Sequence, residues 1–326
     1  MKIIFFGTSG FAVPSLTELY HSPHKIETVV TQPDKRSGRG LKVRFTPVKE
    51  KALSLGLNVE QPEDILGESH AKLNDKETLN LLRSKDSDVF VVVSYGKILS
   101  SEILTIPELY SINLHGSLLP KYRGAAPINR VIINGENKTG VTVIKMIEKL
   151  DAGDILSSLE VNIGQDETAV ELEARLSWMG AELLLDTLNR IEKGEVSFTA
   201  QDELKSSYAP KLKKIDGLIN WNKSAYHIHN QVRGMTPYPC AFTSIEENGI
   251  KKLLKVWQTS LETNPKKGSD FKPGTVTGIN KDGITVQTAS GNILLKELQI
   301  EGGRRVSSYQ FAMGHRMGIG AILGEE

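Results

Sequence analysis

The chain has 326 residues, of which 39% are hydrophobic and 24% are charged, and its formal net charge is +1. No apolar run approaches the ~18–20 residues of a membrane-spanning helix, and the opening MKIIFFG is too short for the apolar region of a secretory signal peptide. The one cysteine, Cys240, excludes an intramolecular disulfide and provides no CxxC metal motif. We therefore expect a cytoplasmic protein without a bound metal.

Strand-like and helix-like segments alternate in the first part of the chain. The apolar run KIIFF, followed by GTSG, predicts a strand and a turn into a helix that begins near Phe11. Further strands are expected at 26–31, 88–93 and 111–115, and helices near 46–55, 76–84, 101 and 126–134. This alternation predicts an α/β fold with a doubly wound, mostly parallel, Rossmann-like sheet, in which ligands bind beyond the carboxyl ends of the strands.

The pattern changes after residue 138. Segments 139–146 and 155–161 alternate like strands, and 167–192 has the apolar spacing of a long amphipathic helix. A linker at 205–214 and a helix at 224–232 are followed by short strand-like runs between Gly, Asn and Asp turns, which predict a small OB-like β-barrel. These runs are 253–257, 274–279, 283–287 and 292–297.

The two parts of the chain also differ in charge. Residues 1–206 hold 24 Lys/Arg against 29 Asp/Glu, a net charge of −5, whereas residues 207–326 hold 16 against 10, a net charge of +6. A basic domain is the usual sign of a nucleic-acid partner, although a solvated surface rich in lysine is an equal alternative. Because single cores rarely exceed ~250–300 residues, we predict two domains, 1–204 and a basic 205–326.

A second basic feature is the segment QPDKRSGRGLKVRFTP at 32–47, which is much longer than the usual connection of ~2–6 residues between a strand and a helix. Its one acid is Asp34. Its five cations are Lys35, Arg36, Arg39, Lys42 and Arg44. The segment is either a mobile, solvated loop or a basic finger that becomes ordered on a phosphate backbone.

The most informative pattern is INLHGSLLPKYRGAAPINR at 112–130, followed by LDAGD at 150–154. In a strand at 111–115, Asn113 and His115 point to the same face, and Asp151 follows in a Gly-containing turn between two strands. An amide, an imidazole and a carboxylate can stabilise an oxyanion and transfer a proton without a metal or a covalent nucleophile. A lone histidine is more often structural, but Asn113 and the turn SLLPKYRG favour chemistry, with Arg123 either binding a charge or bracing the loop.

Two other patterns are weaker. The turn from Gly7 to Gly10 lacks the GxGxxG spacing of a dinucleotide site, so a tight strand-to-helix turn is the better interpretation and a nicotinamide oxidoreductase is a remote alternative. His227 and His229 point to opposite sides of a probable helix and have no third ligand nearby, which argues against a metal site.

The residues INLHGSLLPKYRGAAP and LDAGDIL closely resemble the formyltransferase family that uses 10-formyltetrahydrofolate. The segments FGTSGFAVPSL, QPDKRSGRG, VVVSYGKILS and IDGLINWNKSAYHIHNQVRGMTPYPCAF resemble in particular the members that act on methionyl-tRNA. The resemblance therefore covers nearly the whole chain. Two positions depart from it: Asn220 precedes Trp221 where the family commonly has Asp, and Cys240 stands in a turn where Gly is usual.

The resemblance implies transfer of a formyl group from 10-formyltetrahydrofolate to the α-amine of methionyl-initiator tRNA, with no metal. Asn113 would stabilise the formyl oxygen, His115 would support that oxygen or move a proton, and Asp151 would orient the imidazole or accept a proton from the amine. The implied folate-binding residues are Ser117, Leu118, Leu119, Pro120, Tyr95 and Gly96. The five cations of 32–47 would bind the tRNA, with Arg39 entering the region of the acceptor stem. We expect a monomer.

Two alternatives keep the same scaffold. A sugar-nucleotide N-formyltransferase would use the same three catalytic residues, and a non-catalytic RNA-binding protein would need none of them. The basic segment and the basic second domain favour tRNA over a sugar, and the intact Asn–His–Asp set favours an enzyme.

Overall fold

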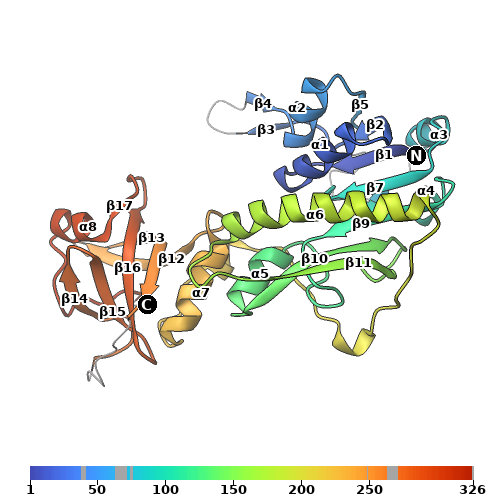
Figure 1. The fold of residues 1–326 in the computed structure, drawn as a ribbon. Coiled ribbons are helices and arrows are strands. Elements are labelled where there is room, and N and C mark those ends of the chain that lie inside the picture. Colours follow the sequence, from blue (N-terminus) through green and yellow to red (C-terminus); the bar gives the residue numbers. More distant parts are fainter. Residues whose placement is uncertain (38–41, 63–71, 74–75, 248, 263–270, 325–326) are drawn as a thin grey trace. The chain divides into compact units, whose positions relative to one another are not determined.

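The computed structural model describes residues 1–37, 42–62, 72–73, 76–247, 249–262 and 271–324 (Figure 1). The chain forms two compact units. Unit 1 comprises Met1–Pro127, Thr139–Val161 and Glu173–Pro210, and unit 2 comprises Ile128–Lys138, Asn162–Leu172 and Lys211–Glu326. No helix in these described ranges is both long and apolar enough to cross a membrane. The assignment of separate roles to 1–204 and 205–326 stays a prediction.

A seven-stranded sheet with its helices and two short strand pairs is formed by the first part of the chain. Its elements are β1 (Lys2–Gly7), η1 (Gly10–Ala12), α1 (Val13–His21), β2 (Lys25–Val30), β3 (Lys35–Ser37), β4 (Lys42–Arg44), α2 (Pro47–Ser54), β5 (Val59–Glu60), β6 (Lys72–Leu73), α3 (Lys76–Arg83), β7 (Val89–Val93), β8 (Ile98–Leu99), α4 (Ser101–Leu104), β9 (Tyr110–His115), α5 (Pro127–Ile133), β10 (Lys138–Lys145), β11 (Ile155–Asn162), α6 (Ala169–Glu192) and η2 (Glu203–Lys205). The strand order is β11-β10-β9-β7-β1-β2-β5. Neighbours from β9 to β5 are parallel and β10 runs antiparallel to β9, which confirms the predicted mostly parallel α/β sheet.

Helices cover both faces of this sheet, as its apolar strands require. On one face, Phe6 of β1 and Val92 of β7 pack in a buried cluster with Leu82 of α3. On the other face, α6 passes closely over Leu114 of β9 at Gly180, where a Cβ atom would lie 2.8 Å from the leucine side chain. Val92 of β7 is the register partner of Asn113 in β9. Because paired residues of neighbouring strands point to the same face, Asn113 lies on the face covered by α3.

Unit 2 contains an antiparallel sheet in the region where the short strand-like runs predicted a small OB-like β-barrel. Its remaining elements are η3 (Lys214–Gly217), α7 (Ala225–Met235), β12 (Ala241–Glu247), β13 (Ile250–Leu261), β14 (Val276–Asn280), β15 (Gly283–Gln287), β16 (Asn292–Ile300), β17 (Val306–Ser307) and α8 (Ser308–Gly314). The strands are ordered β12-β13-β16-β15-β14, with β17 pairing with β16. One apolar core, which includes Ile228, Leu254 and Leu295, lies beneath this sheet. Sequence patterns had indicated four of these six strands and missed β12 and β17.

His229 and Cys240, two residues of unit 2 singled out in the sequence, are both buried in the structure. His229 is buried in α7, where its Nδ1 lies 2.9 Å from the Thr259 hydroxyl, and burial lowers its pKa. It is therefore a structural histidine. Cys240 has a φ of +68°, in the left-handed region that glycine tolerates best, and burial raises the pKa of its thiol to about 11.

The basic segment at 32–47 is organised as a hairpin at its base. β3 and β4 pair antiparallel, with Lys35 opposite Arg44. Below the hairpin, Asp34 accepts a hydrogen bond from Lys49 Nζ at 2.6 Å. Arg39 lies outside the described residues, so its predicted contact with the acceptor stem stays a prediction.

Candidate active site

The three catalytic candidates lie at the carboxyl end of the parallel sheet. Asn113 and His115 occupy alternate positions of β9, as predicted, and β10 pairs Ile144 with Asn113 and Thr142 with His115. Asp151 lies in the turn between β10 and β11 and has a φ of +50°. β10 runs from Thr142, opposite His115, to Lys145, opposite Ile112, so it is the turn after β10 that folds back and carries Asp151 to His115.

His115 and Asp151 face each other. The distance from His115 Nδ1 to Asp151 Oδ2 is 3.7 Å, and only 7% and 11% of the two side chains are exposed. His115 Nε2 lies 2.9 Å from the carbonyl oxygen of Tyr122. Because a carbonyl oxygen can only accept a hydrogen bond, Nε2 carries a proton. Nδ1 is therefore the nitrogen that is free to exchange a proton with a group near Asp151.

The loop after β9 supplies backbone groups to both side chains. Tyr122, with a φ of +62°, presents its carbonyl to His115, and Gly124 donates its N–H to Asp151 Oδ2 at 2.8 Å. Gly124 has a φ of +115°, and a Cβ there would lie 3.0 Å from the Ala209 carbonyl oxygen. The glycine of the YRG motif is thus required by the backbone conformation that delivers this N–H.

A pocket opens beside Asn113 and Asp151. Its other lining residues are Lys97, Ile98, Leu99, Ile144, Met146, Ile147, Glu148, Lys149 and Leu150. Six of the lining residues are apolar, and Asn113, Asp151, Lys97, Glu148 and Lys149 add polar groups. Such a site suits a flat, largely apolar ligand whose polar atoms meet a few fixed groups. Within the described part of the chain, no group of three His, Cys, Asp or Glu side chains could hold a metal ion.

The predicted folate-binding residues are not among those that line this pocket. Tyr95 is buried, and its carbonyl oxygen accepts hydrogen bonds from Thr8 Oγ1 and Gln32 Nε2, at 2.8 and 2.9 Å. Ser117 donates to the carbonyl of Lys121, and its own carbonyl accepts from Thr142 Oγ1. These contacts fix the two loops, 94–99 and 116–121. A direct role of Tyr95, Gly96 and Ser117–Pro120 in folate binding stays a prediction, and sequence reasoning did not single out 97–99 or 146–150.

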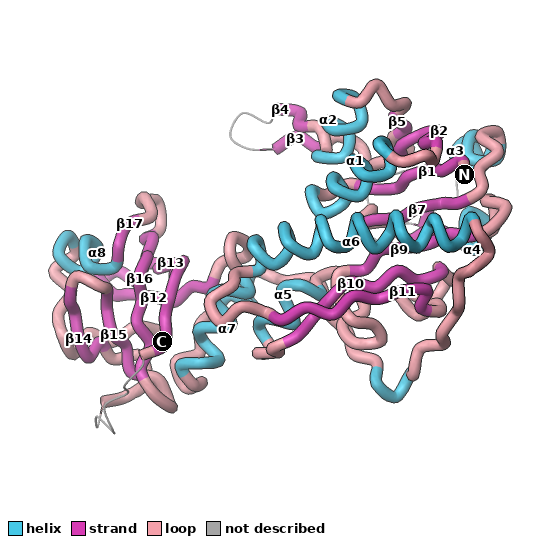
Figure 2. The backbone as a smooth tube through the Cα atoms, in the orientation of Figure 1, coloured by secondary structure: helices cyan, strands magenta, loops and turns pink. Residues whose placement is uncertain are grey.

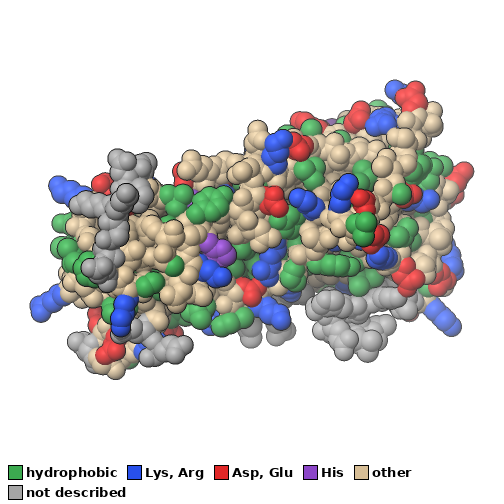
Figure 3. All heavy atoms as spheres, turned by 90° about the horizontal axis from the view of Figure 1, so that it is seen from below, with side chains coloured by type: hydrophobic (Ala, Val, Ile, Leu, Met, Phe, Trp, Pro, Cys, Tyr) green, Lys and Arg blue, Asp and Glu red, His purple; other side chains and the backbone are tan. Residues whose placement is uncertain are grey.

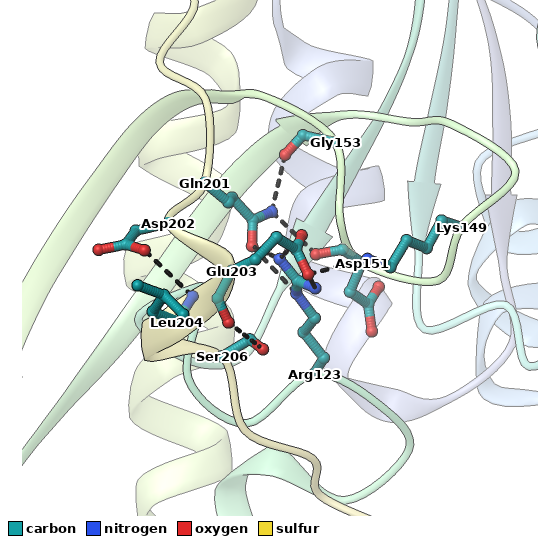
Figure 4. A network of polar contacts seen from close by, with 9 residues as sticks. All are labelled: Arg123, Lys149, Asp151, Gly153, Gln201, Asp202, Glu203, Leu204 and Ser206. Carbon is teal, nitrogen blue, oxygen red and sulfur yellow. Dashed lines mark hydrogen bonds and ion pairs between the residues drawn. The ribbon is translucent and has the colours of Figure 1, made fainter.

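Arg123 braces the site, which was one of its two predicted roles. Its guanidinium is fully buried and donates to Gln201 Oε1 and to both carboxylate oxygens of Glu203 (Figure 4). Glu203 also accepts from Lys149 Nζ at 2.8 Å. Hydrogen bonds from Arg123 first, and then from Lys149, lower the pKa of Glu203 to about 2. Gln201 and Glu203 had no recognisable motif and could not be found from the sequence.

Several basic groups elsewhere in the chain are exposed, in contrast to Arg123. Arg44 is exposed, and exposed cations of unit 2 include Lys213, Lys251 and Arg304. On the face drawn in Figure 3, Lys and Arg side chains are dispersed among acidic and apolar ones. One aromatic platform stands out: Arg305 lies 4.9 Å above the ring of Trp257.

Comparison with known proteins identifies the class. The formyl transferase family model matches residues 1–188, and the model of the formyl transferase C-terminal domain matches residues 211–316. The chain belongs to the formyltransferase family.

Within that family, the similarity extends from end to end to proteins named methionyl-tRNA formyltransferase. The one from Alkaliphilus metalliredigens (strain QYMF) is 44% identical over 326 residues, covering 100% of this chain and 99% of the relative. The one from Clostridioides difficile (strain 630) is 44% identical over 324 residues, covering 99% and 100%.

Solved structures show the same fold at lower identity. The sugar 3N-formyl transferase WlaRD, solved with dTDP and 5-N-formyl-THF, has a TM-score of 0.63 at 19% identity and covers 90% of this chain and 97% of its own. HypX from Aquifex aeolicus, in complex with tetrahydrofolic acid, has a TM-score of 0.61 at 16% identity and covers 98% of this chain and 48% of its own. These likenesses concern the fold alone.

Proposed function

We propose that this protein transfers the formyl group of 10-formyltetrahydrofolate to the α-amino group of methionyl-initiator tRNA, giving formylmethionyl-tRNA. The observation that carries the proposal is the meeting of Asn113 and Asp151 in one pocket, with His115 facing Asp151. The end-to-end similarity to methionyl-tRNA formyltransferases selects the acceptor.

The chemistry needs little activation of the nucleophile. An α-amino group has an ordinary pKa of ~7.7–8.0, so a substantial neutral fraction is present near neutral pH. The enzyme must orient this amine, stabilise the oxyanion that forms when it attacks the formyl carbon, and move one proton from the amine to the departing folate nitrogen. Asn113, on the pocket wall, donates its amide N–H to the developing oxyanion.

The His115–Asp151 pair handles the proton. Because Tyr122 holds His115 Nε2, the exchangeable position is Nδ1, which faces Asp151 Oδ2. Asp151 is itself oriented by the Gly124 N–H. The proton lost by the amine enters this pair and leaves it for folate N10, so the catalyst returns to its starting state without a covalent intermediate.

The two substrates use different surfaces. The apolar wall formed by Ile98, Leu99 and Ile144 accepts the flat pterin ring of the folate. The hairpin cations Lys35, Arg36, Arg39, Lys42 and Arg44 and the basic unit 2 bind the phosphates of the tRNA. We propose that the enzyme acts as a monomer, in the cytoplasm, and without a metal.

The test is formyl transfer from 10-formyltetrahydrofolate to three acceptors: methionyl-initiator tRNA, methionyl-elongator tRNA and a 4-amino sugar nucleotide. Product on the initiator tRNA alone would support the proposal. Product on the sugar nucleotide would keep the chemistry and reject the acceptor. Absence of product on all three would leave an RNA-binding scaffold and reject the catalytic assignment.

A further inference from the structure

Residues 199–209, called the strap below, hydrogen-bond to the two loops that carry the active site. Figure 2 shows this segment as loop with one short helical turn, η2. At its start, Thr199 and Ile155 exchange backbone hydrogen bonds of 2.8 and 2.9 Å. At its end, Arg123 N–H donates to Ser207 O at 2.8 Å, and Ala209 N–H donates to Arg123 O at 2.7 Å. The strap therefore pairs with the Asp151 turn and with the loop that holds His115, although part of it had been predicted as a linker.

Gln201 lies at the centre of the strap and joins the two loops through one amide. Its Nε2 donates to the carbonyl oxygens of Asp151 and Gly153, at 2.8 and 2.7 Å. Its Oε1 accepts from Arg123 Nη2 and Nε, at 2.8 and 3.1 Å. All of these contacts are drawn in Figure 4. The amide uses both its donors and its acceptor: the nitrogen binds the Asp151 turn, and the oxygen binds Arg123 of the other loop.

Both loops have backbone conformations that need support. Asp151 and Tyr122 have φ values of +50° and +62°, in the left-handed region that L-residues other than glycine rarely adopt. Such conformations persist only when surrounding contacts determine them. The Gln201 amide fixes the carbonyl of Asp151 itself, and thereby the direction in which the carboxylate leaves the backbone toward Gly124 and His115.

The Gln201 side chain bridges the Asp151 turn and Arg123, and the Arg123 end of this bridge is also fixed. The buried guanidinium of Arg123 has an ionic partner in Glu203, and Glu203 holds Lys149 of the pocket wall at 2.8 Å. The strap thus contacts the turn on both sides of its strained residue. Movement of Gln201 would release the turn even though Gln201 does not line the pocket.

We infer that Gln201 is a positioning residue for formyl transfer, which acts on the reaction through Asp151. This inference rests on the proposed function. Displacement of a catalytic group by about 1 Å can cost ~10²-fold in rate, so loss of the Gln201 bridge should lower kcat by about 10–100-fold. The KM values for the folate and for the tRNA should change by less than about threefold, because Gln201 does not itself line the pocket.

Gln201→Glu provides a sharp first test. Its carboxylate can still accept from Arg123, but its second oxygen faces the two carbonyl oxygens of the Asp151 turn and cannot donate to them. It should therefore lose as much kcat as Gln201→Ala. The matched control is Asp202→Ala in the same strap, since Asp202 bonds to Leu204 N–H and Lys205 and to neither loop. Asp202→Ala should leave kcat within about twofold of the wild-type value.

A double-mutant cycle with Asp151→Asn decides whether the effect runs through Asp151. Single-turnover rates at saturating enzyme are used for the full chain, because they do not depend on the folded fraction. We expect Gln201→Ala to lower the rate 10–100-fold in the wild type and less than about threefold in Asp151→Asn. An equal factor in both backgrounds would show a general structural role and overturn the inference, as would an unaffected Gln201→Ala enzyme.

The same experiment separates this inference from the proposed function. If Asp151→Asn alone keeps wild-type kcat, the catalytic assignment of Asp151 fails, and the inference fails with it. If Asp151→Asn is strongly impaired while Gln201→Ala and Gln201→Glu are not, the proposed function stands and only the role of Gln201 is rejected.

Discussion

The active-site region and the basic surfaces hold their polar groups in opposite ways. In the active-site region, His115 and Asp151 are nearly buried. The hydrogen bonds of His115 and Gln201 tie them to backbone carbonyls of neighbouring loops, and those of Arg123 tie it to the side chains of Gln201 and Glu203. Arg44 of the hairpin and several cations of unit 2, such as Lys213, are exposed. Catalysis requires groups fixed before the reaction begins, whereas attraction of a polyanion depends on charge and tolerates movement. A single substitution should therefore be severe in the first region and mild in the second.

The largest effect is expected for Asp151→Asn. The amide oxygen can still accept the Gly124 N–H, so the turn should keep its shape, but the group can no longer take up a proton. We expect kcat to fall about 10²–10⁴-fold, the usual range for loss of a general base or acid, with KM values nearly unchanged. Steady-state kinetics with both substrates would measure this. A loss confined to KM would mean that Asp151 binds substrate instead of moving the proton.

Asn113→Asp should follow in size. The substitution keeps the volume of the side chain and removes its donor, which typically costs about 2.7–4 kcal/mol of transition-state stabilisation, or 10²–10³-fold in kcat. Asn113→Ala should lose a similar amount. If only the alanine variant were impaired, packing in the pocket, and not a hydrogen bond to the oxyanion, would explain the loss.

On the basic surfaces the expected effects are smaller. Removing one phosphate contact with Arg44→Ala should weaken tRNA binding several-fold and reduce the slope of log affinity against log salt by about 1. The control is Lys193→Ala, an exposed lysine just beyond the end of α6. Binding titrations across a range of salt concentrations would test this, and a wild-type affinity that does not respond to salt would remove the electrostatic role altogether.

The smallest effect concerns stability in acid. Because the folded chain lowers the pKa of Glu203 from 4.5 to about 2, the ionised carboxylate stabilises the fold fully above pH 4.5. That stabilisation is lost progressively as the pH falls toward 2. The difference in free energy of unfolding between wild type and Glu203→Gln should therefore be constant near neutrality and shrink below pH 4.5. A difference that grows on acidification would contradict the stabilisation of ionised Glu203 by Arg123 and Lys149.

The sequence by itself determined the parts of this protein that depend on local pattern. Strand and helix periodicity predicted the parallel sheet, and the two-residue spacing of Asn113 and His115 placed both on one face of β9. Turn residues and short strand-like runs predicted four of the strands of unit 2, as parts of a small β-barrel. These features could be predicted because side-chain direction in a strand follows from residue spacing alone.

Only the tertiary structure decided which distant segments meet. Gln201 lies 50 residues from Asp151 and 78 residues from Arg123 along the chain, and nothing in its neighbours marks it. The same holds for the carbonyl of Tyr122, which selects the proton-bearing nitrogen of His115. Such contacts depend on backbone conformations with positive φ at non-glycine residues and on the path of a loop. These are set by packing across the whole fold and not by local residue preferences.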